Sequence, residues 1–235
     1  MTPFIAEILG SAILILLGNG TVANVVLSKT KGNSSGWIVI TIGWGLAVFA
    51  AVFMVGPISG AHINPAVTLG LAMAGSFAWE LVPGYIAAQF IGTFLGAILV
   101  WLHYHPHFAS TKDKSDKLAV FCTAPAIRST WWNLVSEVIG TFVLVLGVLH
   151  ISAPEVGLGA LDALPVGLLV LVIGIALGGT TGYAINPARD LGPRIAHAVL
   201  PIAGKGGSDW SYAWVPVVGP VLGGLAAAGL YGILG

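Results

Sequence analysis

The chain has 235 residues, of which 57% are hydrophobic and only 8% charged, and its nine basic residues balance its nine acidic ones. Soluble domains carry about 25% charged residues, so most of this surface must be solvated by a lipid bilayer. A neutral chain offers no basic surface for nucleic acid, and a single cysteine, Cys122, excludes an internal disulfide.

Six stretches are long and apolar enough to cross a membrane, which takes about 20 residues for about 30 Å of hydrocarbon. All six are expected to be helices, because an unpaired backbone polar group is too costly in lipid. The first run lacks a basic start and is far longer than the hydrophobic region of a signal peptide, so it is expected to stay as a span. The predicted spans cover residues 3–27, 37–55, 81–102, 132–151, 161–177 and 212–234.

Two further apolar stretches, residues 64–75 and 186–199, are too short to cross, and each begins with Asn-Pro. Asn is a good helix cap, and Pro in the first turn loses no N–H that the helix needs. Each stretch is therefore predicted to be a half-helix that enters the membrane from one side. The irregular backbone before it must be satisfied by protein or by a water-filled cavity.

The half-helices belong to an internal repeat. Residues 59–70 (SGAHINPAVTLG) and 181–192 (TGYAINPARDLG) share seven of twelve positions, and Glu7 in the first span matches Glu137 in the fourth. Because each half contains three spans, an odd number, the second copy is inverted in the membrane relative to the first. Folds with such inverted repeats have their binding site near the bilayer midplane, where the halves meet. The predicted class is all-α, with six transmembrane helices and two re-entrant half-helices. The half-repeats are residues 1–108 and 130–235, joined by a loop at 109–129.

Asn64 and Asn186 are the first candidate site residues. Opposed half-helices would bring their N-termini together near the bilayer centre, where each carries about half a positive charge. Each amide could aim an N–H at a passing oxygen, in addition to capping its helix. Such a site favours neutral hydroxyl groups and water and repels cations.

The twin motifs Asn64-Pro65-Ala66 and Asn186-Pro187-Ala188 resemble those of the aquaporin superfamily, and the resemblance covers all six spans. Several features resemble its glycerol-conducting branch, the aquaglyceroporins: Asp190 directly after Arg189, then Arg194, and Pro216-Val217 in the last span.

The resemblance implies a narrow filter made of Trp44, Gly174, Tyr183 and Arg189. Trp44 and Tyr183 would form an apolar corner for a carbon backbone, while Arg189 would donate hydrogen bonds to hydroxyls. Gly174 would leave room where water-selective relatives carry a histidine. Ionisable residues at membrane depth usually mark function, which favours this role for Arg189 over that of an interfacial anchor.

The resemblance also implies two ladders of pore carbonyls and a set of loop supports. Glu7 and Glu137 could be proton relays, as in coupled transporters, but the resemblance favours acceptors for backbone N–H groups of the loops. Asp190 is expected to support a loop as well. The ladder carbonyls would come from Gly60, Ala61, His62, Tyr183, Ala184 and Ile185.

The remaining sequence patterns are weaker indications of structure and function. Three glycine pairs are spaced for close helix approach: Gly92/Gly96, Gly174/Gly178 and Gly219/Gly223. No metal site is expected, because the alternating His103, His105 and His107 do not share a helix face and have no acidic or Cys neighbour. No phosphate-binding loop or converging catalytic set is present in the sequence, so neither a cofactor nor an enzymatic activity is expected.

The distribution of basic residues and the family resemblance predict opposite orientations of the chain in the membrane. Counting spans places all nine Lys and Arg on one side, which the positive-inside rule would make cytoplasmic, with both termini outside. The resemblance implies cytoplasmic termini, and we follow it because Arg189 and Arg194 are expected to belong to the pore.

The resemblance thus implies a passive channel of the cell membrane for glycerol and similar small uncharged solutes. It would also conduct water, exclude protons and ions, and form a homotetramer with one pore per subunit. Its partners would be those solutes and membrane lipid, without nucleic acid. The alternatives are a water-selective channel and an ion-coupled secondary transporter, since inverted repeats occur in both classes.

Overall fold

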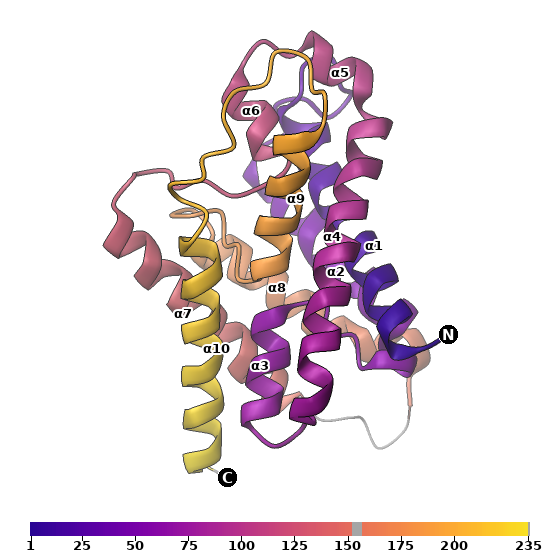
Figure 1. Cartoon of the computed structure of the whole chain (residues 1–235), viewed down its shortest axis with the longest axis vertical. Coiled ribbons are helices and arrows are strands. Elements are labelled where there is room, and N and C mark those ends of the chain that lie inside the picture. The colour runs from indigo at the N-terminus through magenta and orange to yellow at the C-terminus, as the bar shows by residue number, and fades with distance from the viewer. Residues whose placement is uncertain (152–156, 235) are drawn as a thin grey trace.

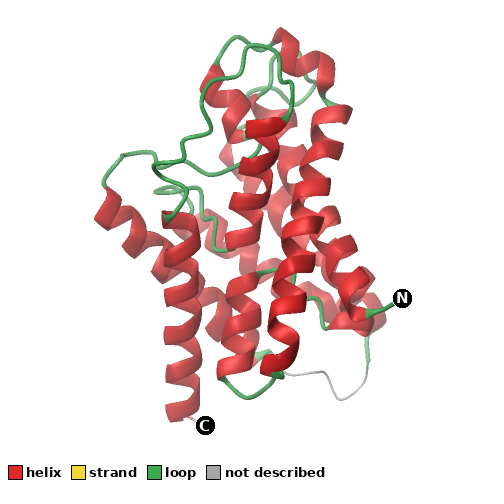
Figure 2. Ribbon diagram, in the orientation of Figure 1, coloured by secondary structure: helices red, strands yellow, loops and turns green. Residues whose placement is uncertain are grey.

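The computed structural model of the chain describes residues 1–151 and 157–234, and all regular structure in this part is helical (Figures 1 and 2). Six helices are long and apolar enough to cross a membrane, which confirms the predicted fold class. Their α-helical parts are α1 (Pro3–Val26), α2 (Trp37–Ser59), α4 (Val82–His103), α7 (Thr130–His150), α8 (Leu164–Leu177) and α10 (Val215–Leu234). The spans that contain α4 and α8 begin earlier, at Trp79 and Gly159. The 3-10 turns η1 (Trp79–Leu81) and η2 (Gly159–Ala163) precede α4 and α8.

The two half-helices are α3 (Pro65–Met73) and α9 (Pro187–Val199), while the short helices α5 (His105–Ser110) and α6 (Lys114–Ala119) lie in the connecting segment. α9 lies above α3 in Figure 1, so that their N-terminal ends face each other in the middle of the molecule. Both half-helices begin with proline after an Asn cap, as the Asn-Pro pattern predicts. Asn64 Oδ1 accepts from the Ala66 N–H at 2.9 Å, and Asn186 Oδ1 accepts from the Ala188 N–H at 3.0 Å.

The predicted end of the second span at residue 55 is wrong, because α2 continues to Ser59. Pro57 falls in the last turn of α2, where its missing N–H costs a single helical hydrogen bond. The helix ends instead at Gly60, whose φ of 79° is a left-handed conformation that glycine adopts without strain. The chain then enters the irregular segment that leads to α3.

Two of the predicted glycine pairs allow close helix contact. A Cβ on Gly92 of α4 would lie 2.3 Å from the carbonyl oxygen of Ile8 in α1, and one on Gly223 of α10 would lie 2.3 Å from that of Val138 in α7. Any larger residue would force these helices apart. The α1–α4 and α7–α10 pairs are therefore equivalent contacts in the two halves.

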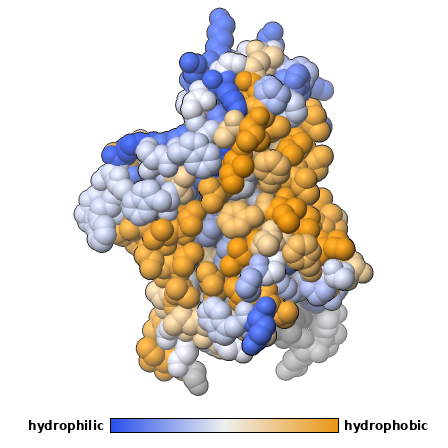
Figure 3. Space-filling model, in the orientation of Figure 1, coloured by the Kyte–Doolittle hydropathy of each residue, from blue (hydrophilic) through white to orange (hydrophobic). Residues whose placement is uncertain are grey.

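The outer surface is that of a protein surrounded by lipid. Figure 3 shows hydrophobic residues over the middle of the molecule and hydrophilic ones gathered at the upper end, near α5 and α6. Large apolar side chains such as Leu46 and Leu99 are exposed, which would be costly in water. Trp131, Trp132 and Trp210 are exposed next to the ends of spans, where an aromatic belt is expected.

The segment between α6 and α7 packs Cys122 into the interior. The thiol is buried beside the Leu118 carbonyl, 3.8 Å away, and burial raises its pKa. Since the thiolate is the reactive form, we expect N-ethylmaleimide at pH 8 to label the folded protein slowly and the unfolded protein completely, as followed by mass spectrometry. Fast labelling of the folded protein would contradict the packing of this segment.

Candidate pore and selectivity filter

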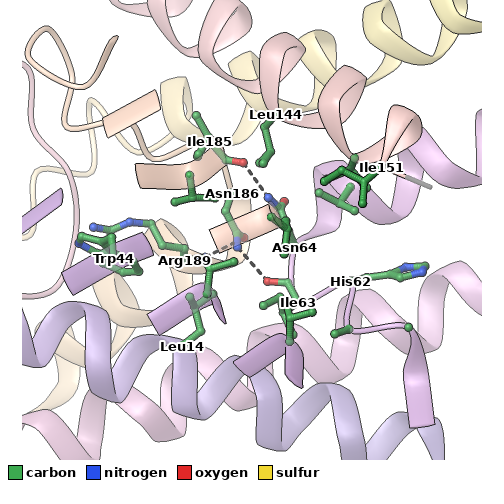
Figure 4. A pocket seen from close by; sticks show the side chains of 18 of the residues that line it. Leu14, Trp44, His62, Ile63, Asn64, Leu144, Ile151, Ile185, Asn186 and Arg189 are labelled. Carbon is green, nitrogen blue, oxygen red and sulfur yellow. Dashed lines mark hydrogen bonds between the residues drawn. The ribbon is translucent and has the colours of Figure 1, made fainter. Parts of the chain in front are cut away.

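The two half-helices are joined at their N-terminal ends by a reciprocal pair of hydrogen bonds. Asn64 Nδ2 donates to the Ile185 carbonyl at 2.8 Å, and Asn186 Nδ2 donates to the Ile63 carbonyl at 2.8 Å (Figure 4). An amide nitrogen carries two N–H groups, so each Asn keeps one donor beyond this bond. The Ile185 carbonyl, expected as a ladder acceptor, already receives one hydrogen bond and keeps its second lone pair.

A buried carboxylate holds the irregular segment before α3. Glu7 is fully buried, and its Oε1 accepts from Ser59 Oγ at 2.7 Å and from the His62 N–H at 3.0 Å. Its Oε2 accepts from the Ile63 N–H at 2.8 Å and from Gln89 Nε2 at 2.8 Å. These bonds satisfy backbone donors that have no helical partner.

Glu137 makes the matching contacts before α9. Its Oε1 accepts from Thr181 Oγ1 at 2.7 Å and from the Ala184 N–H at 3.0 Å, and its Oε2 accepts from the Ile185 N–H at 2.9 Å. Both glutamates therefore occupy the loop-supporting positions expected from the sequence. Each carboxylate oxygen accepts at least one hydrogen bond from a loop or side-chain donor, as a loop-supporting role requires.

The two segments carry strained backbone that these carboxylates stabilise. Four non-glycine residues have left-handed φ values, namely Ala61 (49°), Ile63 (43°), Tyr183 (36°) and Ile185 (42°). Each such residue costs about 1–3 kcal/mol and persists only where its surroundings enforce it. The alternation of left-handed residues is the same in both halves, so the segments are structural copies.

A cavity of about 280 Å³ runs between the halves. Its polar flank includes every predicted ladder residue and both motif asparagines, whereas Pro65, Ala66, Pro187 and Ala188 are buried in the first turns of the half-helices. Most of the remaining lining residues are apolar, namely Leu14, Val48, Val52, Val67, Leu71, Leu144, Val148, Ile151, Val166 and Val170.

Arg189 and Trp44 meet at one end of this cavity (Figure 4). The Arg189 guanidinium lies 4.1 Å from the centre of the Trp44 ring (Figure 4), a cation–π contact. Its Nη1 donates to Asn19 Oδ1 and to the Phe121 carbonyl, both at 3.5 Å. Among the residues that the structure describes, its other N–H groups have no partner. They are the donors available to a solute in the cavity.

Tyr183 occupies the space that Gly174 leaves, which corrects the expected role of this glycine. A Cβ on Gly174 would lie 2.8 Å from Tyr183 Cζ, and one on Gly178 would lie 2.4 Å from Tyr183 Cδ1. Trp37 packs edge-on against the Tyr183 ring at 5.8 Å and donates from Nε1 to the Gly174 carbonyl at 3.2 Å. Gly174 and Gly178 therefore leave space for the Tyr183 ring and not for a neighbouring helix. Gly174 itself is not among the residues that line the cavity.

Arg194 does not belong to the pore, contrary to expectation. It is fully buried behind the cavity, where its Nε pairs with Asp190 Oδ1 at 2.8 Å and its other nitrogens donate to the carbonyls of Thr123 and Ser208. Asp190 Oδ2 also accepts from the Thr123 N–H at 2.7 Å. The pair joins α9 to two connecting segments, which is the loop support expected of Asp190.

The family model described as "Major intrinsic protein" matches residues 1–231. The chain belongs to the major intrinsic protein family. It is 62% identical to a probable glycerol uptake facilitator protein of Thermotoga maritima over 98% of each chain. It is 60% identical to a glycerol uptake facilitator protein of Bacillus subtilis, over 95% of this chain and 81% of that one.

A solved structure agrees with this assignment. The X-ray structure of the aquaglyceroporin from Plasmodium falciparum has a TM-score of 0.85 and 34% identity, and covers 97% of this chain and 93% of that one. The expected superfamily and branch are confirmed. This major intrinsic protein is a multi-pass membrane protein, as its six apolar helices require.

Sequence reasoning about this major intrinsic protein missed three residues that touch the filter. Asn19 is a buried polar residue inside an apolar span, and that signal alone could have found it. Trp37 stands at the start of a span, where a tryptophan is expected at the membrane interface whatever its contacts. Phe121 contributes a backbone carbonyl, for which its side chain gives no signal.

Proposed function

We propose that this chain is a passive channel, not an enzyme, that conducts glycerol and similar small uncharged solutes together with water. The observation that carries the proposal is the set of side chains around the Arg189 end of the cavity. Trp44 and Tyr183 offer aromatic surface to a solute, and Arg189 offers the N–H groups that have no partner among the described residues. A polyol has carbon along one side and hydroxyls along the other, so such an opening matches it.

The cavity beyond the filter supports the same solute class. One flank carries the two asparagine amides and the irregular backbone, and the other flank is lined by Val and Leu. A glycerol molecule could keep its carbon chain on the apolar side while its hydroxyls exchange hydrogen bonds with the polar side. Two of the relatives described above are named as glycerol uptake facilitators.

Exclusion of ions and protons forms part of the proposal. Both half-helix N-termini and Arg189 place positive charge along the cavity, and Asp162 is its one acidic lining residue in the described part of the chain. Beside the half-helix N-termini and Arg189, cations would lose hydration without gaining an anionic partner. Donors at the two asparagines would break a continuous proton-conducting chain of water.

We further propose cytoplasmic termini and a homotetramer with one pore per subunit. Both termini lie toward the end of the molecule opposite α5 and α6 (Figure 1). The segment after α1 is tied to the α5–α6 region, since the Ser28 N–H donates to Thr111 Oγ1 at 2.9 Å. Family membership supports both statements, and the complete cavity within one chain supports one pore per subunit.

Stopped-flow light scattering on proteoliposomes tests the proposed function. We expect glycerol flux far above that of protein-free vesicles, rising linearly with the glycerol gradient, together with fast water flux and no acidification of a trapped pH dye. Fast water flux with glycerol flux at the lipid level would indicate a water-selective channel. Saturable flux that requires an ion gradient would indicate a secondary transporter.

A further inference from the structure

We infer that Asn19 is a positioning residue that fixes the guanidinium of Arg189 and thereby sets the ratio of glycerol to water conduction. The inference rests on the proposed function. Asn19 lies in α1, outside the four predicted filter positions, and its side chain is completely buried. A buried amide within an apolar span is costly unless it has specific partners.

The partners of Asn19 form a closed triangle. Asn19 Nδ2 donates to the Phe121 carbonyl at 3.2 Å, and Arg189 Nη1 donates to both Asn19 Oδ1 and the same carbonyl at 3.5 Å. Arginine has only donors and a carbonyl has only lone pairs, so the amide fits in one orientation. Each of the three groups therefore restrains the other two.

This triangle supplies a restraint that the remaining contacts of Arg189 lack. Stacking on Trp44 fixes the distance between the guanidinium and the ring, but it leaves the guanidinium free to slide and rotate in its own plane. The backbone around Phe121 belongs to a connecting segment without regular structure. Asn19 ties both Arg189 and that carbonyl to a rigid spanning helix.

The acceptors in the triangle are neutral, and this matters for the charge at the filter. Arg189 makes no ion pair in the described part of the chain, whereas the neighbouring Asp190 is committed to Arg194. Asn19 thus holds the guanidinium in place without cancelling its charge. The positive charge that repels cations is retained.

The same turn of α1 also determines where Trp44 sits. A Cβ on Gly18 would lie 2.4 Å from Trp44 Cζ3, so only glycine allows the ring its present position. Gly18 and Asn19 are consecutive, and together they form the wall behind the two filter residues Trp44 and Arg189. A displacement in this turn would move both.

The test compares wild type with Asn19→Leu, which keeps most of the volume but removes both hydrogen bonds, and with Asn19→Ala, which leaves space for water around Arg189. Glycerol and water permeability are measured on the same proteoliposomes. We expect the glycerol-to-water ratio to fall roughly threefold to tenfold in both variants, the range for losing one ordinary hydrogen bond. Glycerol needs fixed donors to replace its hydration, whereas the smaller water molecule tolerates a displaced guanidinium.

Ser11→Ala is the matched control, because Ser11 is a fully buried polar residue of the same helix whose Oγ has no partner within the described residues. Its ratio should equal that of wild type. An unchanged ratio in both Asn19 variants, or failure of both to fold while Ser11→Ala accumulates normally, would overturn the inference in favour of a purely structural residue. Absence of glycerol flux in wild type would instead refute the proposed function.

Discussion

Replacing Gly174 with histidine is expected to abolish glycerol conduction, because the new side chain must displace Tyr183 toward the pore. The Cβ alone would lie 2.8 Å from Tyr183 Cζ and 3.0 Å from Thr41 Cγ2, closer than packed carbon atoms tolerate. Overpacking of this kind costs about 1–3 kcal/mol, and the ring can relieve it only toward the cavity. Stopped-flow measurement of glycerol and water flux should show loss of the first and a strong reduction of the second.

Adding Tyr183→Ala to Gly174→His tests the cause. In the double variant, removal of the Tyr183 ring returns space to the pore, while the histidine fills the space beside residue 174 on α8. We therefore expect water flux to recover and glycerol flux to stay low. Gly84→His is the matched control, since Gly84 lies on an exposed face of α4 and a Cβ there meets nothing within 4 Å. If the Gly174→His variant still conducts glycerol, the space that Gly174 leaves for the Tyr183 ring does not determine the filter.

The arrangement of spans and half-helices could be predicted from the sequence because the bilayer restricts the options. Only helices satisfy the backbone in lipid, so apolar length locates the spans. The Asn-Pro pattern locates the start of each half-helix, and the structure places both starts at the predicted residues. The end of α2 was mispredicted, because apolar length alone does not show that the helix continues through Pro57 to Ser59.

The filter was only partly accessible to sequence reasoning. Spacing from the motifs led to Trp44, Tyr183 and Arg189, and all three line the cavity. Spacing does not say which way a side chain turns, so Gly174 was expected at the pore, where the Tyr183 ring covers it, and Arg194 was expected there although it faces Asp190. Contacts between α1 and a loop carbonyl, such as that of Asn19, depend on tertiary packing alone.

In both halves a buried glutamate holds the irregular segment before the half-helix, but the two glutamates accept different numbers of hydrogen bonds. Ser59 and Thr181 donate to Glu7 and Glu137 at the same distance, 2.7 Å, and each carboxylate then accepts two backbone N–H groups. Within residues 1–151 and 157–234, Glu7 alone of the two has a further donor, Gln89 Nε2 at 2.8 Å. The segment before α9 carries the filter residue Tyr183 yet depends on the carboxylate with fewer bonds, so it is the more sensitive of the two to substitution.

Changing Glu137 to glutamine should therefore reduce the yield of folded protein more than it introduces any pH dependence of flux. In either orientation, the new NH2 group faces a backbone N–H, that of Ala184 or that of Ile185. An unsatisfied buried group costs about 1–3 kcal/mol, enough to change abundance roughly several-fold. The measurements are the monodisperse fraction after extraction, the unfolding temperature in detergent, and glycerol flux from pH 5 to pH 8.

Glu80→Gln provides the control, since Glu80 is an exposed carboxylate in η1 and its loss leaves no buried donor unpaired. We expect its yield and flux to match wild type. Protein of the Glu137→Gln variant that does fold should conduct glycerol with a flat pH profile, because an acceptor of loop N–H groups takes no part in proton movement. A variant that accumulates normally but changes its flux with pH would reverse the assignment and make Glu137 part of a proton pathway.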